Sequence, residues 1–206
     1  MTDINSIGKD SQYAREALDF LQGVIINILL ATDGRTTDLL ETLLNEKMLV
    51  TVIRQEHLNK ELADLLGESS DAPYYMRESI LISDKSHFIV SHNIALVNSR
   101  HVPPSLFEKI AHRQEGIGKS ISSIGLQTFR KVIDSGLKSE EEAVDLFQKP
   151  IKLRFHELHN KVPYKRYSIY FGLVPGIQML EYFNPDVVRH RLKQVVNYKD
   201  GGMNHE

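Results

Sequence analysis

The feature that most constrains this chain is a strand-like stretch with an arginine in its middle. Residues 74–82 read Tyr-Tyr-Met-Arg-Glu-Ser-Ile-Leu-Ile, and the apolar positions Tyr75, Ile80 and Ile82 do not keep to one alternation. This pattern predicts a strand with both faces covered. Arg77 then lies near a covered face, where a guanidinium without an anion is very costly. Two partners are open: Glu78 or another carboxylate of the chain, or a ligand carboxylate bound by two parallel hydrogen bonds.

Composition excludes several classes of protein. The 206 residues are 41% hydrophobic, which suits one substantial core, and they contain no cysteine. Disulfides, cysteine-ligated metals and thiol nucleophiles are therefore excluded. The net charge of -2 gives no reason to expect nucleic acid or an anionic membrane as a partner. The longest apolar run, residues 24–31, is interrupted by Asn27 and is far shorter than the ~20 residues of a membrane span. With a polar, acidic N-terminus unlike a secretory signal, we expect a cytoplasmic protein.

Helical periodicity predicts several helices. Apolar spacing over residues 11–30 indicates a helix that Gly23 divides, and a second helix follows to about residue 45 with Thr36 or Thr37 as its cap. Shorter helical segments are expected at residues 105–112 and 140–147, with a helix or structured loop at 58–66 and a partly helical basic stretch at 187–196. Residues 116–119 are expected to form a turn. The ends, 1–10 and 198–206, are expected to be disordered tails.

The remaining segments favour strands. They are residues 48–55, 74–82, 87–98, 126–134, 151–155, 164–171 and 177–183. The turn at residues 84–86 joins two of them into an antiparallel hairpin. Most strands arrive as hairpins and the helices gather early, so we predict an α+β fold with a mostly antiparallel sheet in a single domain spanning residues 1–206.

Three kinds of catalytic or metal-binding motif are not met by this sequence. His156 and His159 are three residues apart rather than four, so they do not match the zinc-binding HExxH pattern and are better explained by an exposed loop. Residues 116–120, Gly-Ile-Gly-Lys-Ser, lack the first glycine of a phosphate loop. No G-x-S-x-G turn is present for a serine nucleophile. We therefore expect no metal and no cofactor.

Charged residues inside predicted strands are the better candidates for a site. Arg77, Arg130 and Arg166 lie in strands, and Glu181 lies in a largely apolar strand. A buried carboxylate must be paired or hydrogen-bonded. These four residues either satisfy one another or surround a small, anionic, hydroxylated ligand.

The order of these segments resembles the chorismate pyruvate-lyase (4-hydroxybenzoate synthase) family. The similarity runs from about Leu29 to Pro185 and is carried by short motifs. These are Asp33-Gly34-Arg35-Thr36-Thr37, residues 75–81, Gly118-Lys119-Ser120-Ile121, Thr128-Phe129-Arg130, Arg166-Tyr167-Ser168-Ile169 and Glu181-Tyr182-Phe183-Asn184-Pro185. The resemblance implies one six-stranded antiparallel sheet with helices on one side and a ligand buried under helical flaps. The same fold also serves as the sensing domain of some bacterial transcription regulators.

The resemblance also implies roles for individual residues. Arg77 would hold a ligand carboxylate and Glu181 would contact the ring hydroxyl. Ile117, Gly118 and Thr36 would line the pocket, with Arg35 at a flap position that is apolar in well-studied members. Arg130 or Arg166 would add positive charge as the enolpyruvyl group leaves. The implied activity is a cofactor-free elimination of pyruvate from chorismate to give 4-hydroxybenzoate.

Two alternatives remain open. One is a domain that senses an aromatic acid without converting it, although the roughly 30 residues before Asp33 are too few for a winged helix. The other is a lyase for a related carboxylated cyclohexadiene, which Arg35 and the long segment 138–163 both suggest. In each case the expected partner is a small molecule, with no nucleic acid and no membrane, and the oligomeric state is undetermined. Residues 32–45 and 102–120, each containing glycine, are predicted to cover the pocket as flaps.

Overall fold

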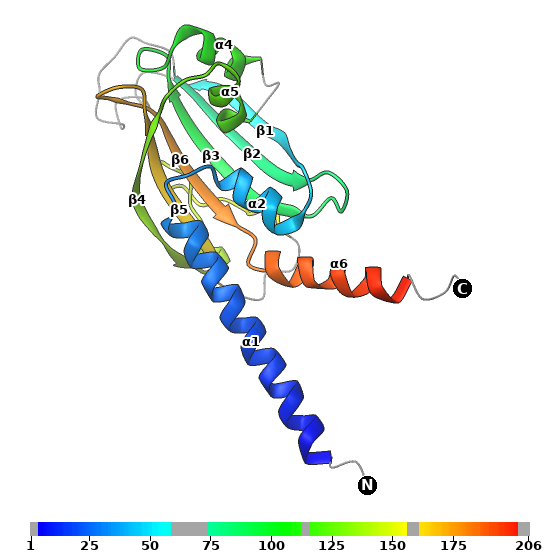
Figure 1. The fold of residues 1–206 in the computed structure, drawn as a ribbon. Helices are drawn as coiled ribbons and strands as arrows, with labels where there is room; N and C mark the ends of the chain where they lie inside the picture. Colours follow the sequence, from blue (N-terminus) through cyan, green and yellow to red (C-terminus); the bar gives the residue numbers. More distant parts are fainter. Residues whose placement is uncertain (1–3, 59–73, 113–115, 156–160, 202–206) are drawn as a thin grey trace.

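The computed structural model describes residues 4–58, 74–112, 116–155 and 161–201, which form an α+β fold around one antiparallel sheet (Figure 1). This confirms the predicted fold class. The six strands are β1 (Met48–Leu58), β2 (Tyr74–Ser83), β3 (Ile89–Asn98), β4 (Phe129–Lys138), β5 (Val162–Tyr170) and β6 (Pro175–Phe183). The five α-helices of the described residues are α1 (Ile4–Ala31), α2 (Thr36–Leu44), α4 (Pro104–Ala111), α5 (Ile117–Ser123) and α6 (Val187–Gly201).

The sheet consists of two meanders joined in the middle. Its strand order is β1-β2-β3-β6-β5-β4, and every neighbouring pair is antiparallel. The predicted hairpin between residues 74 and 98 is therefore the β2–β3 pair. In β1 the register shifts between Val52 and Arg54, so Ile53 lies at a bulge and the alternation expected for residues 48–55 does not continue past Val52.

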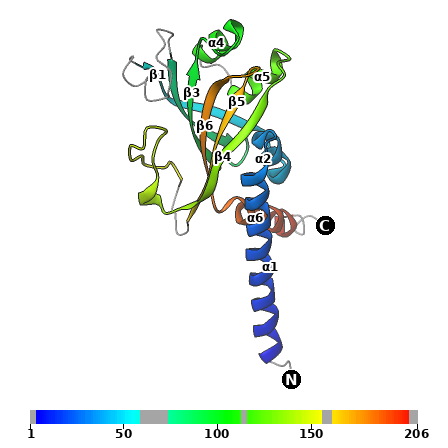
Figure 2. The same cartoon turned by 90° about the vertical axis from the view of Figure 1, so that its left-hand side faces the viewer.

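Both faces of the sheet are covered, as the pattern around Arg77 predicted. On one face α4 and α5 pack Leu106 and Ile121 against Ala95 and Ile177. The opposite face is covered by residues 139–155, a segment without regular strands that lies on the far side of the sheet from α5 (Figure 2). Its buried side chains join those of four strands in one cluster: Ala143, Leu146, Leu153 and Phe155 with Met76, Ile94, Leu96, Val162, Leu180 and Tyr182.

A third cluster closes one end of the sheet. Leu29 of α1, Leu40 of α2 and Val187 of α6 pack around Phe183, the last residue of β6. The three helices thus meet where the central strand ends, and α1 and α6 diverge from this point (Figure 1). No helix of the described residues is long and apolar enough to cross a membrane.

Several helical predictions need correction. Helix α1 begins at Ile4 and runs through Gly23, so the helix is not divided and residues 4–10 are not a loose tail. One internal glycine costs only about 1 kcal/mol, which the packing of the C-terminal half of α1 offsets. The expected turn at residues 116–119 contains the start of α5. Helix α6 continues to Gly201, into the expected C-terminal tail.

Two predictions in the segment 139–155 were wrong. Residues 140–147 form only a short 3-10 helix, Glu140–Glu142, and residues 151–155 form no strand. The apolar side chains Leu153 and Phe155 are buried against the sheet face rather than paired at its edge. A short apolar run is compatible with either arrangement. The expected element at 58–66 and the pair His156 and His159 lie outside the described residues, apart from Leu58, the last residue of β1.

Candidate functional site

A cavity of about 720 Å³ lies on the face of the sheet that α2 and α5 cover. Its floor comes from the strands of the sheet and its cover from the two helices and the residues just before them. The strand residues include Arg77, Ser79, Asn93, Arg130, Tyr167, Met179 and Glu181, and the cover includes Arg35, Thr36, Ile117, Gly118 and Lys119. The two segments predicted as flaps, 32–45 and 102–120, therefore both contribute to the cover. Their mobility remains a prediction.

Strand register explains why these side chains share one face. Ser79, Asn93, Glu181 and Lys165 are successive partners across β2, β3, β6 and β5. The neighbouring row on the same face contains Arg77, Ala95, Met179 and Tyr167. Residues two apart on a strand point to the same face. Arg77 and Glu181, separated by 104 positions in sequence, thus lie on one cavity floor.

Arg77 is 2% exposed and lines the cavity from β2. Its neighbour Glu78 points to the opposite face, where it contacts His92 Nε2 at 3.0 Å and Arg54 Nε at 3.4 Å. The carboxylate that the sequence offered first as a partner is therefore engaged elsewhere. Burial lowers the pKa of His92 despite the nearby Glu78 carboxylate. These contacts tie β1, β2 and β3 together below the site.

Glu181 is buried at the centre of the polar row. Its carboxylate accepts a hydrogen bond of 3.3 Å from the Thr36 hydroxyl and another from Tyr167. Burial raises the pKa of Glu181 above its ordinary value, while the charge of Lys165 and these hydrogen bonds act in the opposite direction. Burial and the Glu181 carboxylate also hold the pKa of Tyr167 well above its ordinary value, so this phenol donates rather than ionises.

Lys165 is a residue of the site that the sequence reasoning missed. It is 1% exposed, and its ammonium donates to the Leu29 carbonyl at 2.9 Å, the Thr32 carbonyl at 3.3 Å and the Thr36 hydroxyl at 3.2 Å. Leu29 lies in the last turn of α1, where the helix dipole favours a cation. Burial lowers the pKa of Lys165, and Glu181 opposes that shift. Lys165 therefore connects the end of α1 to the carboxylate in the cavity.

Thr36 has a different role from the predicted one. Helix α2 begins at Thr36, its N-cap residue is Arg35, and no side chain caps it. The Thr36 hydroxyl instead bridges Lys165 and Glu181. The predicted helix cap is thus a contact of the site, which agrees with its expected place in the pocket wall.

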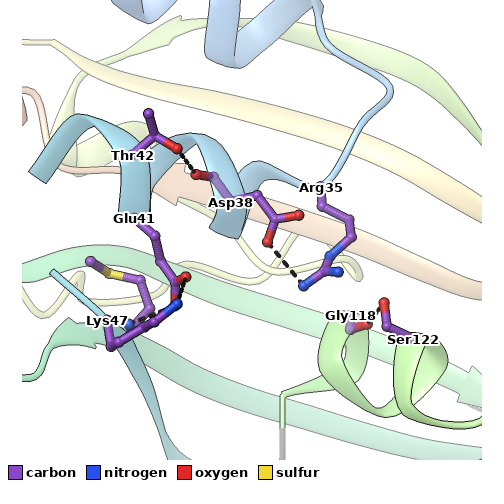
Figure 3. Close-up of polar contacts among 8 residues, drawn as sticks. Arg35, Asp38, Glu41, Thr42, Lys47, Gly118 and Ser122 are labelled. Atoms are coloured by element: carbon purple, nitrogen blue, oxygen red, sulfur yellow. Dashed lines mark hydrogen bonds and ion pairs between the residues drawn. The ribbon is translucent and has the colours of Figure 1, made fainter. Parts of the chain in front are cut away.

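The rim of the cavity carries two ion pairs. Arg35 Nη2 lies 2.9 Å from Asp38 Oδ1, and Lys47 Nζ lies 2.9 Å from Glu41 Oε2 (Figure 3). Both pairs are exposed to solvent, which screens them, so they contribute little to stability. Figure 3 shows α5, with Gly118, on the side of α2 where Arg35 lies. Gly116, the N-cap residue of α5, lies so close to Val50 that an added Cβ would be 2.8 Å from Val50 Cγ2.

The structure brings seven of the eight predicted site residues to the cavity. They are Arg35, Thr36, Arg77, Ile117, Gly118, Arg130 and Glu181. Arg166 is the exception, because it alternates with Lys165 and Tyr167 along β5 and pairs with Leu180, whose side chain belongs to the opposite face. Asn93 was also missed; its Oδ1 is buried and has no hydrogen-bond partner among the described residues. An isolated polar residue in a strand gives no sequence signal that separates it from an ordinary core position.

The sequence matches no protein-family model and no curated protein. Among solved structures, PhnF from Mycobacterium smegmatis has a TM-score of 0.50 at 18% identity, over 76% of this chain and 66% of PhnF. The effector domain of PhnF gives 0.47 at 17% identity, over 75% and 91% of the two chains. A GntR-family transcriptional regulator from Bacillus cereus gives 0.42 at 12% identity, over 68% and 92%.

At these identities the similarity establishes the fold alone. In structure the chain is similar to GntR-family effector domains, which share the chorismate lyase-like fold. The resemblance inferred from the sequence therefore holds for the fold and extends to no sequence family.

Proposed function

We propose that this protein is a ligand-binding domain whose cavity takes a small aromatic or related organic acid without converting it. The observation that carries the proposal is a deeply buried arginine, Arg77, on the floor of an otherwise partly apolar cavity. A guanidinium in such a place stabilises a planar carboxylate by two parallel hydrogen bonds. A volume of about 720 Å³ also lies within the range of roughly 300–1,000 Å³ that is usual for small-molecule sites.

The charges around the cavity favour an anionic ligand. Arg130 lines the wall, and within the described residues it makes no ion pair. Lys119 lies in the cover. The rim residues Arg35 and Lys47 are already paired with carboxylates. The surplus of positive charge thus lies on the wall and in the cover, where it would attract an acid.

The other end of the ligand would meet hydrogen-bonding groups. Asn93 offers an acceptor that is unused within the described residues, and Glu181 is its cross-strand partner. A hydroxyl on the ligand would donate to one of them, which agrees with the role that the family resemblance gives to Glu181. The fold of regulator effector domains supports binding without turnover.

Calorimetry with a matched pair of ligands tests this proposal. We expect 4-hydroxybenzoate to bind and 4-hydroxybenzyl alcohol, which lacks the carboxylate, to bind at least about tenfold more weakly, since hydrogen bonds to a charged group contribute about 1.5–3 kcal/mol. Arg130→Gln should weaken binding of the acid. Lys131→Gln, the neighbouring exposed position on the same strand, should leave the affinity unchanged. Equal affinity for the acid and the alcohol would contradict the proposal.

A second candidate is the chorismate pyruvate-lyase activity itself. The observation that favours it is the raised pKa of Glu181, because a carboxyl group that stays protonated nearer to neutral pH can donate a proton to a leaving group. Arg77 would then bind a substrate carboxylate while the ring C–O bond of the enolpyruvyl ether breaks and Glu181 gives its proton to the departing enolpyruvate. The ring carbon that bears the hydroxyl loses its proton to the Glu181 carboxylate thus formed, which restores the acid, and the gain in aromaticity would drive the elimination. Pyruvate release from chorismate by purified protein, lost in Glu181→Gln, would establish this candidate. Absence of pyruvate despite measurable binding of 4-hydroxybenzoate would leave the binding function alone.

A further inference from the structure

Helix α1 carries an apolar face that the rest of the described chain does not cover. Tyr13 is 71% exposed and Phe20 is 70% exposed, while Leu21, Val24 and Ile28 are 38–52% exposed. The N-terminal half of the helix extends away from the sheet and from the other helices in both views (Figures 1 and 2). Exposed aromatic side chains in such a row on a projecting helix are typical of an interaction surface.

The exposed face follows a seven-residue repeat. Tyr13 and Phe20 are seven apart, and so are Ala17 and Val24, with Leu21 and Ile28 flanking them at the same interval. Tyr13, Ala17, Phe20 and Val24 follow one another at intervals of four, three and four residues, which is the spacing of a coiled-coil seam. The packed side of α1, which includes Leu18, Ile25 and Leu29, lies elsewhere on the helix circumference. One face of α1 therefore holds it on the protein core and a second face is left for a partner.

We propose that this face, Tyr13–Ala17–Phe20–Val24 with Leu21 and Ile28, pairs with the same face of a second copy of the chain. A self-complementary seam of this kind satisfies both copies at once under two-fold symmetry. The five large side chains would remove roughly 500 Å² from water on each copy, taking about 150–250 Å² for each aromatic side chain. The total of roughly 1,000 Å² for the pair is at the minimum expected of a biological interface.

Helix physics supports a copy of α1 rather than solvent as the environment of this face. A helical segment without tertiary contacts is marginally stable in water, and burial of an apolar face is what usually stabilises it. The charges of α1 also disfavour a membrane surface. Between residues 12 and 28 the helix carries Arg15 against Glu16 and Asp19, whereas helices that lie on membranes are rich in Lys and Arg.

Sedimentation equilibrium of the full chain tests the proposal. We expect a mass of twice 23.6 kDa at micromolar concentrations and above. Phe20→Glu should raise the dimer dissociation constant by at least about tenfold, since a central aromatic residue usually dominates such an interface. Phe129→Glu is the matched control, because Phe129 is 60% exposed on β4, and it should leave the constant unchanged. Circular dichroism of both variants checks that the fold is retained.

Three results would overturn the proposal. One is a wild-type protein that remains monomeric at the highest concentration reached. The second is a dimer that Phe129→Glu weakens as much as Phe20→Glu does. The third is a monomer that sediments with phosphatidylcholine–phosphatidylserine vesicles and loses this property in Phe20→Glu, which would identify the face as a membrane-binding surface.

Discussion

Replacement of Lys165 by Met should destabilise the protein in a way that depends on pH. Lys165 and Glu181 are cross-strand partners, both are buried, and Thr36 bridges them. Removing one member of a buried pair usually costs about 3–5 kcal/mol, because the other charge is left uncompensated. The hydroxyls of Thr36 and Tyr167 still donate to Glu181 in the variant, so we expect about 3 kcal/mol at pH 7.

The sign of the pH dependence follows from the raised pKa of Glu181. Loss of the Lys165 charge raises that pKa further above its ordinary value of 4.5. Below pH 4.5 the Glu181 carboxyl group is protonated in both the folded and the unfolded chain, so the substitution removes only the hydrogen bonds of Lys165. Because it also removes the cost of burying the ammonium group, we expect a net loss of about 1 kcal/mol. As the pH rises through the folded pKa, the carboxylate must ionise without its cation, and the destabilisation grows.

Urea unfolding at pH 4 and pH 7 measures this effect. The variants are Lys165→Met, Glu181→Gln and the double variant, which together form a thermodynamic cycle. The double variant has no carboxylate at position 181, so its loss of stability should be similar at both pH values and smaller at pH 7 than that of Lys165→Met. An equal loss for Lys165→Met at both pH values would refute the assigned pairing. A double variant that is as unstable at pH 7 as Lys165→Met would also refute it.

Three further substitutions test the fold around the site. Tyr182→Phe should lower the free energy of unfolding by about 1–3 kcal/mol in urea titrations, because the hydroxyl accepts from the Val144 N–H and donates to its carbonyl; a loss below about 0.5 kcal/mol would contradict this. Gly176→Ala should lower the unfolding temperature at a cost of about 1–3 kcal/mol, because its Cβ would lie 2.6 Å from the His101 carbonyl oxygen; an unchanged temperature would argue against this close approach. Gln148→Gly should raise the unfolding free energy by about 1 kcal/mol, because Gln148 has a φ of 63°; a decrease would show that the side chain matters more than the backbone.

The sequence predicted the sheet well because its signals were local. The β2–β3 hairpin follows from two strand-like runs and a polar turn, and the covered faces of β2 follow from its irregular apolar pattern. The segment 139–155 was misjudged because helix propensity at residues 140–147 is weaker than the burial of Leu146, Leu153 and Phe155 on the sheet. Such packing depends on strands distant in sequence, so no local pattern carries it.

The site residues that the sequence predicted in strands are charged residues within otherwise largely apolar segments. Arg77, Arg130 and Glu181 were found in this way, and the cavity contains all three. Local polarity does not distinguish Lys165 from Arg166. They are adjacent cations on one strand, and only one can point to the face of the sheet on which the cavity lies. The choice depends on the register with β6, where Lys165 is opposite Glu181 and Arg166 is opposite Leu180, and register is set by pairing across the sheet.

A crystal structure of the protein with 4-hydroxybenzoate tests the central claim most directly. The proposed function predicts that the carboxylate lies on the Arg77 guanidinium, that the ring occupies the space between the sheet and helices α2 and α5, and that the hydroxyl reaches Asn93 or Glu181. A ligand bound outside this cavity, or bound inside it with the carboxylate turned away from Arg77, would contradict the account.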